Sequence, residues 1–137
     1  MRTATKEFKR DMAHRLPTHE WKCYNVHWHT YKALVSIEWE LQEEWAETWM
    51  IKDFWNFKPV KDWIDENWDH AYLWSIKDKV YLYLEKEWFK TFWIVGTPTA
   101  ENMAMILYKI SEELLKGCKI KSVTIYETPT SFSSYSE

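Results

Sequence analysis

The pattern of apolar and polar positions predicts that strands and helices alternate along the chain. The clearest strand is expected over residues 27–41, where aliphatic side chains, aromatic side chains and histidines occupy nearly every second position. The residues that share one side of this strand are His27, His29, Tyr31, Ala33, Val35, Ile37 and Leu41. A weaker alternation over residues 5–14 predicts another strand with Phe8, Met12 and His14 on one side. One side of each strand is therefore expected to face a core.

Three other segments complete the extended part of the pattern. The polar segment 41–49 is interpreted as a turn, and residues 50–54 are expected to return as a strand that forms a hairpin. Residues 119–127 are expected to form a strand whose apolar side ends in Glu127. The polar tail, residues 131–137, is expected to fray.

Helices are predicted where apolar residues recur every three or four positions. One is expected from Phe57 to Glu66, and a shorter one begins at Ser75. The clearest runs from Thr99 to Lys116, where Thr99 can cap the start and Gly117 can end the helix. Its predicted buried stripe consists of Met103, Ile106, Leu107, Ile110 and Leu114. Strands and helices in this arrangement indicate the α+β class.

Length and charge narrow the class of protein. The 137 residues suffice for a single domain, residues 1–137, with a core of its own. The formal charge of -3 and the pI near 6.0 argue against a nucleic acid or a membrane surface as partner. No apolar run is long enough to cross a membrane, and Cys23 and Cys118 are expected to be free thiols. We therefore expect a soluble, cytoplasmic protein.

Three of the five histidines form a candidate metal site. A period of two places His27 and His29 on the same side of a strand and Trp28 on the other. Together with His14 they would supply three neutral imidazoles and leave a fourth position for water or substrate, as in catalytic zinc sites. The alternative is that they are hydrogen-bonded core histidines, because the pattern alone does not place His14 beside the other two.

The other candidate residues each have two interpretations. Cys23 is either a small buried apolar residue or, near a dication, a thiolate that acts as base or nucleophile. The adjacent Asp69 and His70 are either a helix-end feature or an acid–base pair. Glu127 either reaches solvent at the end of its strand or accepts two N–H groups from a planar heterocycle.

Six short motifs occur along the chain in this order: MAHRL (12–16), C-x3-H-x-H (23–29), KDF (52–54), DHAYL (69–73), PTAENMA (98–104) and YETPTS (126–131) followed by Tyr135. Each motif is weak alone, but the ordered set is specific. Together they resemble the motifs of the 6-pyruvoyltetrahydropterin synthase and 6-carboxytetrahydropterin synthase family, and the resemblance covers approximately residues 5–135.

The resemblance implies a tunnelling fold, in which a four-stranded antiparallel sheet carries two helices on one face. Subunits of this family join their sheets into a trimeric barrel, and two trimers stack into a hexamer with active sites at subunit boundaries. The implied roles are zinc ligands for His14, His27 and His29, the catalytic thiol for Cys23, acid–base partners for Asp69 and His70, the pterin anchor for Glu127, and substrate-binding positions for Thr99 and Glu101.

The spacing from Cys23 to His27 is similar to that of the 6-carboxy enzymes of queuosine biosynthesis. The implied substrate is 7,8-dihydroneopterin triphosphate, and the implied products are 6-carboxy-5,6,7,8-tetrahydropterin, acetaldehyde and triphosphate. Two alternatives are 6-pyruvoyltetrahydropterin synthase activity and a non-catalytic ring of the same fold that binds zinc or a pterin.

The chain departs from the family through its 11 tryptophans and only 2 glycines. Trp28 and Trp49 stand where the family has glycine, and Trp68 and Trp74 replace a leucine and an asparagine. An indole at a glycine position with positive φ would strain the backbone by roughly one to a few kcal/mol. The candidate ligands themselves are all present.

Overall fold

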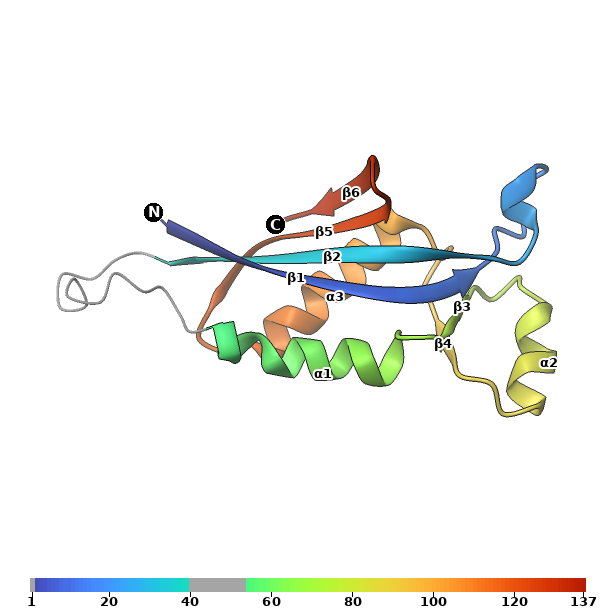
Figure 1. The fold of residues 1–137 in the computed structure, drawn as a ribbon, viewed down its shortest axis with the longest axis horizontal. Helices are drawn as coiled ribbons and strands as arrows, with labels where there is room; N and C mark the ends of the chain where they lie inside the picture. The colour runs from blue at the N-terminus through green and yellow to red at the C-terminus, as the bar shows by residue number, and fades with distance from the viewer. Residues whose placement is uncertain (1, 40–53) are drawn as a thin grey trace, which may run out of the picture.

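The computed structural model of the protein describes residues 2–39 and 54–137, whose arrangement is shown in Figure 1. The strands are β1 (Arg2–His14), β2 (His27–Trp39), β3 (Tyr72–Trp74), β4 (Thr91–Trp93), β5 (Lys119–Thr128) and β6 (Ser131–Tyr135). The α-helices are α1 (Lys58–Asn67), α2 (Val80–Lys86) and α3 (Ala100–Leu114). Two short 3-10 helices are η1 (Lys22–Tyr24) and η3 (Phe54–Phe57). The α+β class is confirmed.

The described strands form one sheet in the order β4-β3-β1-β2-β5-β6. The pairs β1–β2 and β2–β5 are antiparallel, as expected, and the pair β5–β6 is antiparallel too, although no strand was predicted over β6. The short strands β3 and β4 extend the sheet beyond β1 in parallel, so the expected count of four strands was too low. Strands of three residues are too short to show an alternation in the sequence. The expected turn 41–49 and strand residues 50–53 lie outside the described residues, and Phe54 begins η3.

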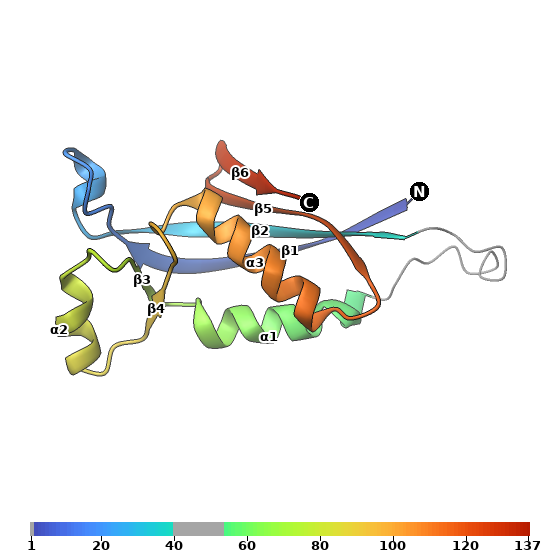
Figure 2. The same cartoon turned by 180° about the vertical axis from the view of Figure 1, so that it is seen from behind.

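One core joins the sheet to both longer helices. Side chains from β1, β2 and β5 share a single buried cluster with side chains from α1 and α3, so both helices cover the same face of the sheet. Figure 2 shows α3 lying across the strands with α1 beside it. The predicted alternation of β2 is confirmed, because Tyr31, Ala33, Val35 and Ile37 are all buried.

Helix α3 begins as predicted, but its buried face differs in part. Thr99 caps it by accepting a hydrogen bond from the backbone N–H of Asn102 at 3.3 Å, and Gly117 follows the helix with a φ of +86°. Leu114 is exposed, and the core instead receives Leu115. The residues that α3 buries are Ala100, Met103, Ala104, Leu107, Tyr108 and Ser111. The buried face of α3, which packs against β5 and β6, is therefore rotated about the helix axis relative to the predicted stripe.

Two other boundaries differ from the predictions. Helix α2 begins at Val80 rather than Ser75, because Ser75 and Asp78 form a turn closed by a hydrogen bond of 2.9 Å. The tail forms strand β6 instead of fraying. Ser134 hydrogen bonds to Thr124 across the strands at 2.7 Å, and the Tyr135 ring packs against α3. In the described part of the chain, no helix has the length and apolarity needed to cross a membrane.

A buried ion pair ties the end of β1 to the segment before α2. Arg15 Nη1 donates to Asp78 Oδ1 at 2.8 Å, and Asp78 also accepts from the Tyr72 hydroxyl and the Val80 backbone N–H. Arg15 Nε donates to the carbonyl of Tyr24 at 3.0 Å. Both charges are almost fully buried, so the attraction between them offsets the cost of removing each from water.

Replacing Asp78 with alanine should therefore lower the free energy of unfolding by about 3 kcal/mol, because the Arg15 charge would stay buried without its partner. The matched control is Asp62→Ala, which breaks an exposed ion pair with Lys58 and should cost less than about 1 kcal/mol. Urea denaturation of both variants measures the difference. Equal losses would show that the buried pair contributes no more than a surface one.

Candidate functional site

The three predicted histidines meet at one end of the sheet. His14 and His27 stand opposite each other at the last pair of the β1–β2 ladder, and His29 follows on the same side of β2. The ligand atoms of the three imidazoles lie within 4.8 Å of one another. His14 is buried, and the other two are half-buried. The strand register therefore brings His14 beside His27 and His29, which the sequence pattern alone did not determine.

Backbone carbonyls orient two of the rings. His14 Nδ1 lies 2.6 Å from the carbonyl oxygen of Pro98, and His27 Nδ1 lies 2.7 Å from that of Asn25. A neutral imidazole that donates from Nδ1 carries its lone pair on Nε2. The two Nε2 atoms face each other at 3.0 Å, so two lone pairs oppose each other unless a cation lies between them. This arrangement fits a metal ion, and it matches the way proteins orient metal-bound histidines.

Glu127 supplies an anion beside the cluster. Its Oε1 atom is 3.3 Å from the Nε2 atoms of both His14 and His29. His29 Nε2 is buried and makes no hydrogen bond within residues 2–39 and 54–137. A buried nitrogen without a hydrogen bond is costly unless a ligand satisfies it. The carboxylate also offsets the charge that a dication would bring.

Burial favours the neutral, ligand form of His14 and His29. Desolvation lowers the pKa of His14 to about 4, and the neighbouring histidines add to this effect against the opposing hydrogen bond to Pro98. Desolvation also lowers the pKa of His29, against the attraction of Glu127. Burial raises the pKa of Tyr31, whose hydroxyl is 3.3 Å from His14 Nδ1, so the phenol stays protonated. Neutral imidazoles are the form that binds a metal.

Trp28, Trp68 and Trp74, which replace other residues of the family, do not disturb the histidine cluster. Trp28 is 76% exposed on the opposite side of β2, as predicted, and its φ is not positive. Trp68 is buried against Trp63 and Phe92, although its indole Nε1 has no hydrogen-bond partner among the described residues. Trp74 stacks on Tyr81 with ring centroids 3.7 Å apart. Trp49 lies outside the described residues. No backbone strain therefore arises at Trp28.

The predicted acid–base residues are not joined to the cluster by the hydrogen bonds and ion pairs of the described residues. Cys23 is half-buried in η1, where its carbonyl accepts a 2.7 Å hydrogen bond from the backbone of Leu16. Asp69 and His70 follow α1, with Asp69 Oδ1 at 2.9 Å from His70 Nδ1. The His70 side chain is 76% exposed, and its φ of 58° turns the chain toward β3. Neither segment contacts the three imidazoles through a hydrogen bond or ion pair.

The predicted substrate-binding residues do share a cavity with the cluster. A cavity of about 240 Å³ is lined by His14, Thr99, Glu101 and Glu127 together with parts of β6. Residues from the start of α3 thus share a cavity with the candidate metal site. Sequence reasoning missed Arg15, which follows the candidate ligand His14 directly and holds the Cys23 segment through the Tyr24 carbonyl. Only its position inside the MAHRL motif could have drawn attention to it.

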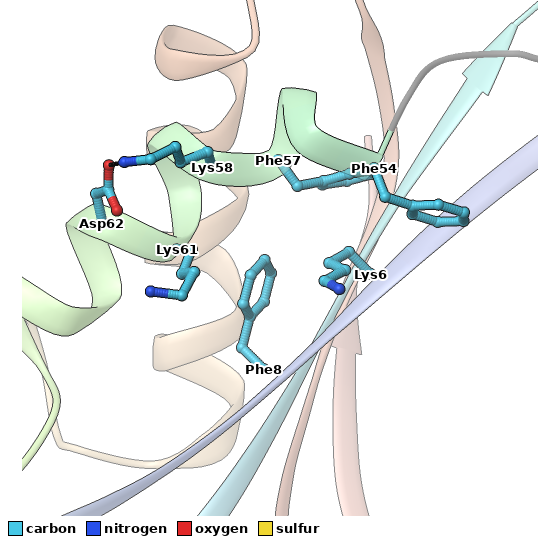
Figure 3. A pocket seen from close by; sticks show the side chains of 7 residues that line it. All are labelled: Lys6, Phe8, Phe54, Phe57, Lys58, Lys61 and Asp62. Carbon is cyan, nitrogen blue, oxygen red and sulfur yellow. Dashed lines mark hydrogen bonds and ion pairs between the residues drawn. The ribbon is translucent and has the colours of Figure 1, made fainter.

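A larger cavity of about 550 Å³ lies at the N-terminal end of α1 (Figure 3). The described residues that line it include none of the predicted site residues. Its lining consists of Lys6, Phe8, Phe54, Phe57, Lys58, Lys61 and Asp62. Lys58 and Lys61 form ion pairs with Asp62 and Asp65. Among the described residues, this lining contains no histidine or cysteine and a single carboxylate, so it does not form a candidate metal site.

A sheet backed by two helices, with three inward-facing imidazoles at one end, defines an α+β protein with a candidate metal site. The chain belongs to the 6-pyruvoyl tetrahydropterin synthase family, whose sequence model matches residues 3–137.

Relatives and solved structures agree with this assignment. A 6-carboxy-5,6,7,8-tetrahydropterin synthase from Haemophilus influenzae is 38% identical and covers 97% of each chain. The enzyme of the same name from Rickettsia bellii is 31% identical over 93% of this chain and 95% of its own. A crystal structure of an uncharacterized protein from Wolinella succinogenes has a TM-score of 0.83 at 23% identity, covering 99% of this chain and 98% of its own. The 6-pyruvoyl tetrahydropterin synthase of Caenorhabditis elegans has a TM-score of 0.71 at 21% identity, covering 98% and 94%. The two structures show that the fold is shared.

The lowered pKa of His14 predicts how the metal-free protein responds to acid. Between a pKa near 6.5 in the unfolded chain and about 4 in the folded chain, only the unfolded chain binds the proton. The free energy of unfolding should therefore fall as the pH drops from 6.5 to 4, by up to about 1.4 kcal/mol per pH unit for this residue.

Urea denaturation in a chelator at several pH values measures this slope. His14→Gln should reduce it, while the control His19→Gln, at an exposed histidine, should leave it unchanged. An unchanged slope in the His14 variant would contradict the assignment.

Proposed function

We propose that this chain is a zinc-dependent 6-carboxy-5,6,7,8-tetrahydropterin synthase, a lyase that acts on 7,8-dihydroneopterin triphosphate. The products are 6-carboxy-5,6,7,8-tetrahydropterin, acetaldehyde and triphosphate, as a step of queuosine biosynthesis in the cytoplasm. The observation that carries the proposal is the three-histidine cluster with Glu127 beside it, in a chain 38% identical over 97% of its length to a relative with this name.

The metal would be held by His14, His27 and His29. Three imidazoles with no bound thiolate form a donor set suited to catalytic zinc, which keeps one position open. When bound, zinc supplies Lewis-acid chemistry that acidifies hydroxyl and C–H groups of the substrate side chain. The carbonyls of Pro98 and Asn25 fix the rings before any metal arrives, so little rearrangement is needed.

Glu127 is the proposed anchor for the pterin ring. A carboxylate can accept two parallel N–H bonds from the edge of an amino-pyrimidinone ring, which fixes both the position and the orientation of the heterocycle. Thr99 and Glu101 line the same cavity of about 240 Å³ and would contact the ring from the start of α3. The reacting side chain would then lie next to the histidines.

Proton transfer is assigned to Cys23 and to the Asp69–His70 pair. The hydrogen bond between Asp69 and His70 orients the imidazole, as expected for an acid–base residue. Because the His70 side chain is exposed and the pair forms no hydrogen bond or ion pair with the histidine cluster of its own chain, we place it at a subunit boundary, where it would complete the site of a neighbour.

Open edges of the sheet support the proposed assembly into a hexamer of two trimers. Strands β4 and β6 are the outermost strands of the described sheet, and the backbone groups on their outer edges can extend the sheet into a neighbouring copy. Light scattering of the purified chain at micromolar concentration should therefore report an oligomer. A monomer at that concentration would contradict both the barrel and the shared active site.

The decisive assay incubates the zinc-loaded protein with 7,8-dihydroneopterin triphosphate and identifies the products by mass. Cys23→Ala should lower kcat about 10²–10⁴-fold, because it removes an acid–base group, while zinc content and pterin affinity are retained. Glu127→Ala should weaken pterin binding while zinc stays bound. Cys118→Ala is the matched control, because it removes the other half-buried thiol and should keep full activity.

Three outcomes contradict parts of this proposal. Formation of 6-pyruvoyltetrahydropterin would assign the chain to the sister activity of the family. Binding of zinc and pterin without turnover would indicate a non-catalytic ring. Full activity in Cys23→Ala would remove the thiol from the mechanism.

A further inference from the structure

An opening in the sheet lies beside the histidine cluster. The β2–β5 ladder ends at the pair Lys32–Tyr126, although β2 starts five residues earlier, at His27, and β5 continues to Thr128. The two strands are therefore not paired with each other beyond Lys32. A cavity of about 490 Å³ lies at this point, with Trp28 and Tyr126 in its lining.

The opening is lined from both faces of the sheet. His29 and Glu127 belong to the side that carries the cluster, whereas Lys9, Thr30 and Lys32 alternate with inward-facing residues and belong to the other side. Because strand side chains alternate, residues from both sides line one cavity only where the strands separate. The cavity therefore brings the helix-free face of the sheet to the candidate metal site.

Two ammonium groups stand on the helix-free side of this opening. Lys9 and Lys32 are direct partners in the β1–β2 ladder, an arrangement in which like charges repel. Lys32 Nζ is 3.9 Å from a carboxylate oxygen of the half-exposed Glu7 and 4.1 Å from the Tyr126 ring centroid. Within the described ranges, Lys9 forms no ion pair. Asp11, on the same face, is hydrogen bonded to Thr30 and does not line the cavity.

The cavity on the other side of Glu127 has the opposite character. Its described lining contains Glu101 and Glu127 and no lysine or arginine. A polyanion would be repelled there, whereas the N–H groups of a heterocycle would be accepted. Charge thus divides the surroundings of the cluster into a basic opening and an acidic cavity, with Glu127 lining both.

We propose that Lys9 and Lys32 bind the triphosphate of the substrate at the opening between β2 and β5. This assignment rests on the proposed function, because it assumes that the substrate is a pterin triphosphate. The triphosphate would then bind in the basic opening and the pterin ring in the acidic cavity. The triphosphate relieves the repulsion between the lysines, and the ring lies beyond Glu127 near Thr99. Trp28, on the same side, closes the opening with an apolar surface.

Inorganic triphosphate is the probe for this subsite, and calorimetry of the full chain measures its dissociation constant at low and at moderate salt. Lys9→Ala and Lys32→Ala should each weaken binding about tenfold, because each removes a charge-assisted contact. The matched control is Lys6→Ala, which removes one lysine from the cavity of Figure 3. Equal weakening by Lys6→Ala, or none by the other two variants, would overturn the proposal.

Two further readouts separate this proposal from misfolding and from failure of the proposed function. Without ligand, Lys9→Ala should unfold at the same or a higher urea concentration than the parent, because it removes a like-charge contact. In the turnover assay, both lysine variants should raise KM for the triphosphate substrate while retaining kcat. If the parent has no turnover, the proposed function fails, and loss of triphosphate affinity in the variants still supports the subsite. Turnover with an unchanged KM in both variants would overturn it.

Discussion

The antiparallel pairing of β1 with β2 is the constraint on which this structure depends. The ladder runs through all thirteen residues of each strand and ends with His14 opposite His27. A slip of one residue would send His27 and His29 to the other face, away from His14. The register is held because Phe8 and Val35, on the same side of the two strands, belong to the buried core. The energy that fixes the site is therefore the burial of apolar side chains elsewhere in the sheet.

The site itself carries a local conflict that the rest of the fold tolerates. Burial favours neutral histidines, yet two neutral rings whose Nδ1 atoms face carbonyls turn their lone pairs toward each other. The backbone carbonyls of Pro98 and Asn25 fix the two rings in this arrangement. Such conflicts are expected where a protein binds a ligand, because the ligand removes them. The like-charged pair of Lys9 and Lys32 at the opening between β2 and β5 is a similar conflict on the other side of the sheet.

The tryptophans Trp28, Trp68 and Trp74 fit this fold because each lies at a position that has room for an indole. Trp28 points away from the cluster because it lies between two inward-facing histidines of one strand. Trp74 finds a stacking partner in Tyr81, and Trp68 fills the core at the end of α1. The buried Trp68 Nε1 without a partner is the visible cost, on the order of 1–3 kcal/mol for an unsatisfied donor. The ligand geometry is unaffected because none of these indoles takes part in it.

The sequence by itself determined the features that depend on neighbouring residues. The period of two put His27 and His29 on one side of β2 and Trp28 on the other, and Thr99 marked the start of α3. It could not determine where the three-residue strands add to the sheet, that the tail pairs as β6, or which face of α3 is buried. Nor could it bring His14 to the other two histidines or open the sheet beyond the last β2–β5 pair. These features were decided by the tertiary structure, because they depend on which distant segments pair and where each ladder ends.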